Sequence, residues 1–247
     1  MIFSLLRIFS TSGKLAELLF FPSFCQLCSC LLESPQERVV CQACWEQVRA
    51  RRRSYCLCCG RFFQGAGEPH FCPSCLKARP PFSLHRSASK YEEKVKDIIL
   101  LFKYHHYKVL GEKLARFAYQ VLKEEEGLWQ KIDAVIPVPL HPKKRRQRGF
   151  NQALVIAEEL EKIRGIKVGR GILLKTKNVP AQTSLEAVDR EKNVIGAFRV
   201  AQEDQIKGKR LLLIDDVYTT GATIRECSRV LIKAGAKEVK AITLAQA

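Results

Sequence analysis

Apolar residues follow two different spacings beyond about residue 90 of this chain. Recurrence every three or four positions predicts helices over 91–104, 110–122, 152–163 and 223–234. Short apolar runs predict strands over 134–138, 172–174, 211–214 and 239–244. Strands that alternate with helices indicate a parallel sheet with helical crossovers, whose ligands bind beyond the carboxyl ends of the strands. We therefore expect an α/β fold with its site in the loops after those strands.

The first 24 residues also have apolar positions at helical spacing, but Arg7, Lys14 and Glu17 interrupt them. A membrane span needs about 18 or more consecutive apolar residues, and no run here reaches that length. No small-residue cleavage site follows an apolar stretch, so a signal peptide fits poorly. The pattern predicts an amphipathic helix over 1–24 that packs on its own protein, with peripheral membrane attachment as the alternative.

Ten of the eleven cysteines lie between Cys25 and Cys75, in a segment too poor in aliphatic residues to fold by apolar burial alone. Four CxxC pairs with equal internal spacing predict two structural Cys₄ zinc sites. Disulfides are the alternative, but a chain without a secretion signal is expected in a reducing cytoplasm. The predicted zinc ligands are Cys25, Cys28, Cys41, Cys44, Cys56, Cys59, Cys72 and Cys75.

The pairing of these cysteine pairs is open between two arrangements. Sequential pairing gives a double zinc ribbon and is favoured by the equal spacing, whereas cross-braced pairing gives an interleaved module. Cys30, Cys58 and Cys227 are left over, and the CxxC spacing makes Cys59 a better ligand than Cys58. Four thiolates leave no open coordination position, so we expect no catalysis by this metal.

The formal net charge of +17 implies a polyanionic partner, which includes nucleic acid, an anionic membrane surface and phosphorylated small molecules. One candidate surface is the basic stretch at 143–148, which follows the strand predicted over 134–138. Charge alone does not choose among these partners.

The segment 211–224 combines an apolar strand, two carboxylates and a loop of small and hydroxylated residues that leads into a helix. Asp215 and Asp216 at the strand end suit vicinal ribose hydroxyls, and the loop offers backbone N–H groups to a phosphate at the helix N-terminus. Gly221 permits close approach of that phosphate. The pattern resembles the motif with which type I phosphoribosyltransferases bind 5-phosphoribosyl 1-diphosphate (PRPP).

The resemblance implies a role for each part of the motif. Asp215 and Asp216 would hold the ribose, and the 5′-phosphate would lie on Tyr218, Thr219, Thr220, Gly221, Ala222 and Thr223. Mg²⁺ would neutralise the leaving diphosphate, which the loop after the first sheet strand would bind through Val138, Pro139, Leu140, His141 and Arg148. Catalytic roles would fall to Lys175 and Arg190, in and beside a closing loop that also contains Gln182 and Asn193.

Several further motifs occur in one order along the chain: the cysteine block, Phe102-Lys-Tyr104, Pro137-Val-Pro-Leu-His141, Arg148-Gly-Phe-Asn-Gln152 and Asp215-Asp216. Together they resemble the ComF family of competence-associated proteins, from about Phe21 to the C-terminus. The resemblance implies a type I phosphoribosyltransferase-like parallel sheet flanked by helices, with an N-terminal double zinc ribbon. The expected limits are 25–80 for the double ribbon and 83–247 for the transferase-like domain.

The family resemblance also implies a role in DNA uptake during natural transformation. It places the protein in the cytoplasm, where it would handle single-stranded DNA beside a competence helicase, and peripheral contact with the inner face of the membrane stays open. No acceptor base is readable, because a recognition hood could come only from 83–122 or from the zinc module. Three hypotheses remain: a nucleic-acid-handling protein that binds PRPP, an active phosphoribosyltransferase, and a scaffold that docks a protein partner.

Overall fold

The computed structural model describes residues 23–32, 38–50, 54–65, 67–177 and 194–247. Most of the helix predicted over 1–24 lies outside these residues, as do Gln182, Arg190 and Asn193. The chain divides into two compact units, 1–48 and 49–247. The second cysteine cluster therefore belongs to the same unit as the sheet, and the domain limits 25–80 and 83–247 stay predictions.

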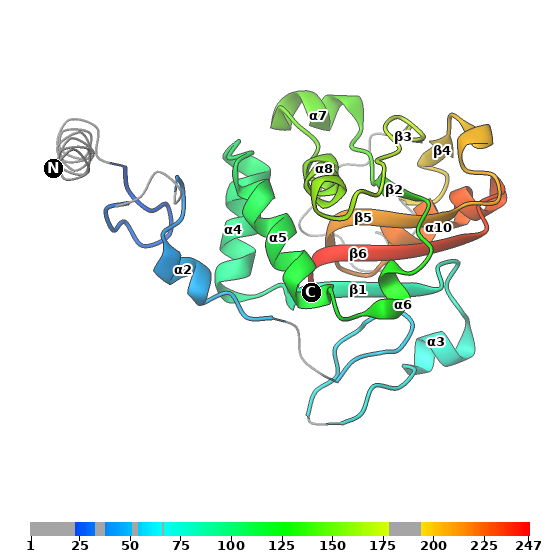
Figure 1. Ribbon diagram of the computed structural model, residues 1–247, viewed down its shortest axis with the longest axis horizontal. Coiled ribbons are helices and arrows are strands. Elements are labelled where there is room, and N and C mark those ends of the chain that lie inside the picture. The colour runs from blue at the N-terminus through cyan, green and yellow to red at the C-terminus, as the bar shows by residue number, and fades with distance from the viewer. Residues whose placement is uncertain (1–22, 33–37, 51–53, 66, 178–193) are drawn as a thin grey trace, which may run out of the picture. The chain divides into compact units, whose positions relative to one another are not determined.

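A four-stranded parallel sheet forms the centre of the larger unit, in the order β1-β6-β5-β2 (Figure 1). Its strands are β1 (Leu84–Lys90), β2 (Ala134–Pro137), β5 (Arg210–Tyr218) and β6 (Glu238–Gln246). β5 and β6 are buried along most of their length because helices cover both faces of the sheet. The parallel sheet predicted from the apolar runs is confirmed.

Helices α5 and α8 pack together on one face of the sheet, and α10 lies on the other (Figure 1). The predicted helices are confirmed as α4 (Glu93–Tyr104), α5 (Leu110–Leu122), α8 (Gln152–Arg164) and α10 (Ala222–Lys233). Short helices are α2 (Gln42–Glu46), α3 (Pro73–Lys77), α6 (Glu126–Trp129) and the 3₁₀ turn η1 (Glu203–Gln205). No helix of the described residues is long and apolar enough to cross a membrane.

Two features of the sheet differ from the sequence prediction. The strand expected over 172–174 forms β3 (Leu173–Lys175), which pairs antiparallel with β4 (Phe198–Val200) in a separate ribbon instead of joining the parallel sheet. Edge strand β1 was not predicted because its buried positions are polar, so it has no apolar run.

The buried polar side chains of β1 bind the second cysteine segment. Arg86 donates to the carbonyls of Cys56 and Leu57 and forms a largely buried ion pair with Glu125 at 3.0 Å. His85 is fully buried, which lowers the pKa of its imidazole to about 3 and keeps the ring neutral. These contacts fix the second ribbon to the edge of the sheet.

Candidate functional site

The two predicted ribose carboxylates lie near the carboxyl end of β5. This strand continues to Tyr218, so both carboxylates are held by strand pairing rather than by a loop. Asp215 Oδ1 accepts a hydrogen bond from the backbone N–H of Asp216 at 2.9 Å. Burial, and then the charge of Asp216, raises the pKa of Asp215 to about 7. Asp215 therefore keeps its proton to a higher pH than an ordinary aspartate does.

Lys103 belongs to this site, although sequence reasoning gave it no role. Its Nζ lies 2.7 Å from Asp216 Oδ1, and both side chains are 14% exposed. Burial alone lowers the pKa of Lys103, but the neighbouring Asp216 outweighs burial and raises it. The motif Phe102-Lys-Tyr104 contained the signal, but only the fold shows that α4 reaches the end of β5.

The loop between β5 and α10 suits a phosphate. Gly221 occupies the N-cap of α10 with φ of 78°, and Thr220 Oγ1 accepts from the N–H of Ala222 at 3.3 Å. The first N–H groups of a helix have no intrahelical acceptor, so they bind anions well. Tyr218 is only 4% exposed, and its ring packs between His85 and Gly221, so this side chain is buried inside the loop and is not exposed to a ligand.

The predicted diphosphate segment begins beside the carboxylates. Pro137 of β2 is in register with Ile214, and the N–H of Val138 donates to the Ile214 carbonyl at 2.9 Å. The side chain of Asn151 donates to the Val138 carbonyl at 3.0 Å while it caps α8. The structure thus places this segment next to Asp215, at the same edge of the sheet.

The basic stretch after this segment is a helix, α7 (Pro142–Arg148), and not the loop that the sequence suggested. Pro142 starts it, His141 caps it through Nδ1 at 3.3 Å from the Lys143 N–H, and Gly149 ends it with φ of 73°. None of the side chains of α7 is buried, so its sequence has no apolar stripe from which a helix could be predicted.

Arg148 points back toward α4. Its guanidinium donates to Gln152 at 3.2 Å and to the Tyr104 hydroxyl at 3.4 Å, and it lies 5.0 Å from the centre of the Tyr104 ring. His106 Nδ1 lies 3.1 Å from the Arg148 carbonyl. The C-terminal end of α4 therefore contacts both the carboxylate pair, through Lys103, and the end of α7.

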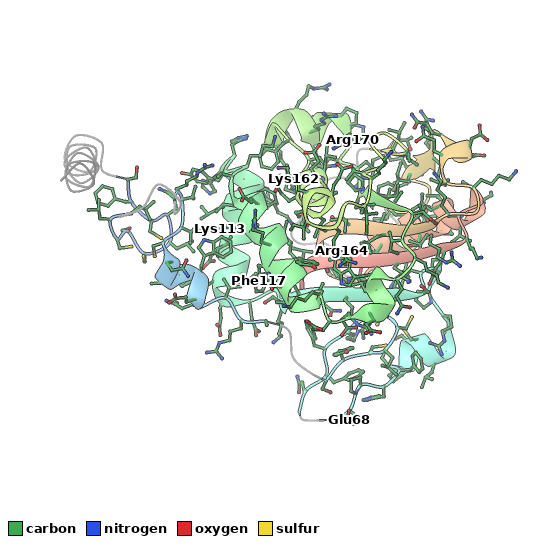
Figure 2. All side chains as sticks on the ribbon, in the orientation of Figure 1. Glu68, Lys113, Phe117, Lys162, Arg164 and Arg170 are labelled. Atoms are coloured by element: carbon green, nitrogen blue, oxygen red, sulfur yellow. The ribbon has the colours of Figure 1, made fainter. Side chains whose placement is uncertain are left out.

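A cavity of about 670 Å³ adjoins this segment, within the usual range of ligand pockets. Pro139, Leu140 and His141 line it together with Lys175 from β3. Burial lowers the pKa of Lys175, and Asp215 opposes that shift, so the lysine lies in the field of the carboxylates. Val138 and Arg148 do not line the cavity. Arg170, labelled in Figure 2, does line it and pairs with Glu158 and Glu161.

The second cysteine cluster fits a zinc ion. The sulfurs of Cys56, Cys59, Cys72 and Cys75 lie within 4.8 Å of one another, with 3.8 Å between Cys59 and Cys72. Four sulfurs at about 2.3 Å from one zinc are about 3.8 Å apart. The Cys72 N–H donates to Cys56 Sγ at 3.3 Å, which favours the thiolate that binds metal. Zinc at this site would hold the segment 56–75 together.

The first cluster gathers five thiols. Cys25, Cys28, Cys30 and Cys41 lie within 4.8 Å of one another, and Cys44 Sγ lies 3.9 Å from Cys25 Sγ. Cys44 is buried and Cys30 is exposed. The structure groups neighbouring CxxC pairs in both clusters, which confirms sequential pairing. The choice of Cys44 as the fourth ligand stays a prediction, because the group of four mutually close sulfurs contains Cys30 in place of Cys44.

Comparison with known proteins agrees with both parts of the chain. Residues 103–247 match the phosphoribosyl transferase domain, and residues 16–76 match the double zinc ribbon domain. Competence protein F of Haemophilus influenzae is 31% identical over 84% of this chain and 90% of its own length. This chain belongs to the ComF family. This chain has both a phosphoribosyl transferase domain and a double zinc ribbon domain, as the order of its motifs predicted.

Two other proteins are similar to this ComF-family chain. The DNA utilization protein YhgH of Salmonella typhi is 29% identical over 90% of this chain and 96% of its own length. A structure of glutamine PRPP amidotransferase from B. subtilis, complexed with ADP and GMP, is 23% identical and has a TM-score of 0.36. It covers 57% of this chain, which spans 26% of that structure.

Proposed function

We propose that this protein binds PRPP with Mg²⁺ at the end of β5 and binds single-stranded DNA through α7, in the cytoplasm of a cell that takes up or uses DNA. The observation that carries the PRPP part is the junction of Asp215 and Asp216 with the N-terminus of α10 and the segment after β2. Ribose hydroxyls, 5′-phosphate and diphosphate each find a suitable group there: carboxylates, helix N–H groups and a cationic cavity.

Calorimetry tests the PRPP part. Wild-type protein loaded with zinc is titrated with PRPP and Mg²⁺ beside the double variant Asp215→Asn, Asp216→Asn. The control variant is Asp204→Asn, which removes an exposed carboxylate of η1. The proposal predicts saturable binding by the wild type and by Asp204→Asn, with loss in the double variant. Equal binding by the double variant would show that the ligand lies elsewhere.

The DNA part rests on the charge of α7 and on the names of the relatives. α7 carries Lys143, Lys144, Arg145, Arg146 and Arg148, and no carboxylate of the described residues forms an ion pair with any of them. An exposed helix with this unneutralised charge attracts a phosphate backbone. Relatives named for competence and for DNA utilization support DNA as the polyanion.

A second candidate function is phosphoribosyl transfer to a nucleobase or another nucleophile with release of diphosphate. The cavity beside the diphosphate segment favours it, because about 670 Å³ leaves space for an acceptor and Lys175 is among the residues that line it. In this case Lys175 and Arg190 would be catalytic. Diphosphate release with a panel of acceptors, compared with the Asp215→Asn, Asp216→Asn variant, separates turnover from binding alone.

A further inference from the structure

Tyr218, at the start of the phosphate loop, packs against His85 of β1. Its ring stacks on His85 with 4.1 Å between ring centres and 20° between ring planes. The same ring packs against the Cα of Gly221, so a side chain at Gly221 would collide with the Tyr218 hydroxyl. The phosphate loop therefore closes over a tyrosine whose position is set by an imidazole of β1.

His85 is itself fixed by the second zinc ribbon. Nδ1 lies 2.8 Å from the carbonyl oxygen of Cys59, and since a carbonyl only accepts, the proton of the neutral ring lies on Nδ1. Nε2 lies 3.1 Å from Thr243 Oγ1, which also contacts Ser87 at 2.6 Å. The imidazole thus has one hydrogen bond to a predicted zinc ligand and one to the sheet, and its face is left for Tyr218.

The ribbon backbone holds β1 closely at the same place. The N–H of His85 donates to the Cys58 carbonyl at 2.8 Å, and a side chain at Gly60 would approach the His85 carbonyl to 2.6 Å. The four cysteines of the second cluster belong to the same buried cluster as Tyr218 and Ile224. Because short cysteine-rich segments usually depend on their metal to fold, we expect the Cys59 carbonyl to keep its position only while zinc is bound.

We propose that the second zinc ribbon positions the phosphate loop through the contacts Cys59–His85–Tyr218–Gly221, with His85 and Tyr218 as positioning residues. The inference rests on the proposed PRPP function for its ligand. It predicts that binding of the 5′-phosphate depends on zinc at the second site. The first cluster, in the other compact unit, provides the control.

Two matched variants test the proposal, Cys72→Ser in the second cluster and Cys41→Ser in the first. Each variant lacks the first cysteine of the second CxxC pair within its own cluster. Each is expected to lose one zinc ion, measured by metal analysis. We expect PRPP affinity to fall at least about tenfold in Cys72→Ser and to stay within about twofold in Cys41→Ser. Amide hydrogen exchange over 218–224 should rise about tenfold only in Cys72→Ser. Unchanged affinity and exchange in Cys72→Ser would overturn the proposal.

His85→Gln covers the case in which Cys72→Ser does not fold. This variant keeps every zinc ligand, so we expect a wild-type zinc content together with lower PRPP affinity and faster exchange over 218–224. Wild-type affinity and exchange in His85→Gln would refute the role of this contact chain. If wild-type protein does not bind PRPP, the proposed function fails, and the exchange measurement alone decides whether the ribbon positions the loop.

Discussion

Lys103 of α4 places its ammonium group 2.7 Å from a carboxylate oxygen of Asp216 on β5, with only 14% of either side chain exposed. The pair anchors the end of the helix beside the end of the strand. It also brings a positive charge to the place where a polyanionic ligand is expected. Lys103 therefore links the folding of α4 to the proposed ribose site.

Replacement of Lys103 by Met is expected to lower both stability and PRPP affinity. Loss of one partner leaves Asp216 largely buried without its counter-charge, which costs about 2–4 kcal/mol of unfolding free energy. PRPP affinity should fall at least about tenfold, measured by calorimetry below the melting temperature. Lys96→Met removes an exposed lysine of the same helix and should change neither quantity. Wild-type affinity in Lys103→Met would remove this lysine from the site.

The raised pKa of Asp215 predicts a specific dependence of stability on pH. The folded-state pKa of about 7 lies above the ordinary value of 3.8, so the folded protein holds a proton that the unfolded chain has lost between those values. The contribution of Asp215 to the free energy of unfolding is therefore fully present below about pH 4 and is lost as the pH rises to about 7.

Asp215→Asn removes that loss because an amide does not ionise, and its Oδ1 still accepts the Asp216 N–H. We expect the variant to exceed wild type by about 1–3 kcal/mol at pH 8, since each pKa unit corresponds to about 1.4 kcal/mol, and to match it near pH 4. Urea unfolding at both pH values measures the difference. A variant less stable than wild type at pH 8 would contradict the assigned pKa direction.

Removal of two exposed cations from α7 should weaken DNA binding without loss of PRPP binding. In Lys143→Ala, Arg146→Ala, the slope of log affinity for an oligo-dT strand against log salt should become less steep by about 1.4, since each phosphate contact contributes about 0.7. Lys233→Ala, Lys237→Ala removes the same charge near the start of β6 and controls for net charge. Equal slopes in the two double variants would indicate that α7 does not contact DNA.

Gly221 and Gly208 form a matched pair for the phosphate loop. Both have positive φ, 78° and 73°, so Ala at either costs about 1 kcal/mol of backbone strain. A Cβ at Gly221 meets the Tyr218 ring, whereas a Cβ at Gly208 meets nothing within 4 Å. Gly221→Ala should therefore abolish PRPP binding, and Gly208→Ala should lose only stability. Calorimetry and thermal unfolding of both variants separate the two effects.

The sequence predicted the parts of the fold in which local pattern and tertiary environment agree. The apolar run before Asp215 became a central strand, and the helical spacing over 110–122 became α5 with the same limits. The CxxC spacing predicted two clusters because a tetrahedral metal constrains that spacing directly.

The features that the sequence did not predict depend on contacts between segments that are distant in the chain. The sequence of β1 is polar, so it does not resemble a buried strand. Arg86 and His85 can be buried there because they bind carbonyl oxygens of the second ribbon, and those partners are distant in the sequence. The helix α7 has no apolar stripe, and its evidence was limited to the Pro142 start and the Gly149 end. Lys103 joined the site only because the end of α4 reaches the end of β5, so its role was not visible from its neighbours in the chain.

The most direct test of the account is a crystal structure of the zinc-loaded protein with PRPP and Mg²⁺. The account predicts that the ribose hydroxyls lie within hydrogen-bond distance of the Asp215 and Asp216 carboxylates. It also predicts that the 5′-phosphate accepts from backbone N–H groups of 219–223. PRPP bound at another place, or no PRPP density at these carboxylates at saturating concentration, would contradict it.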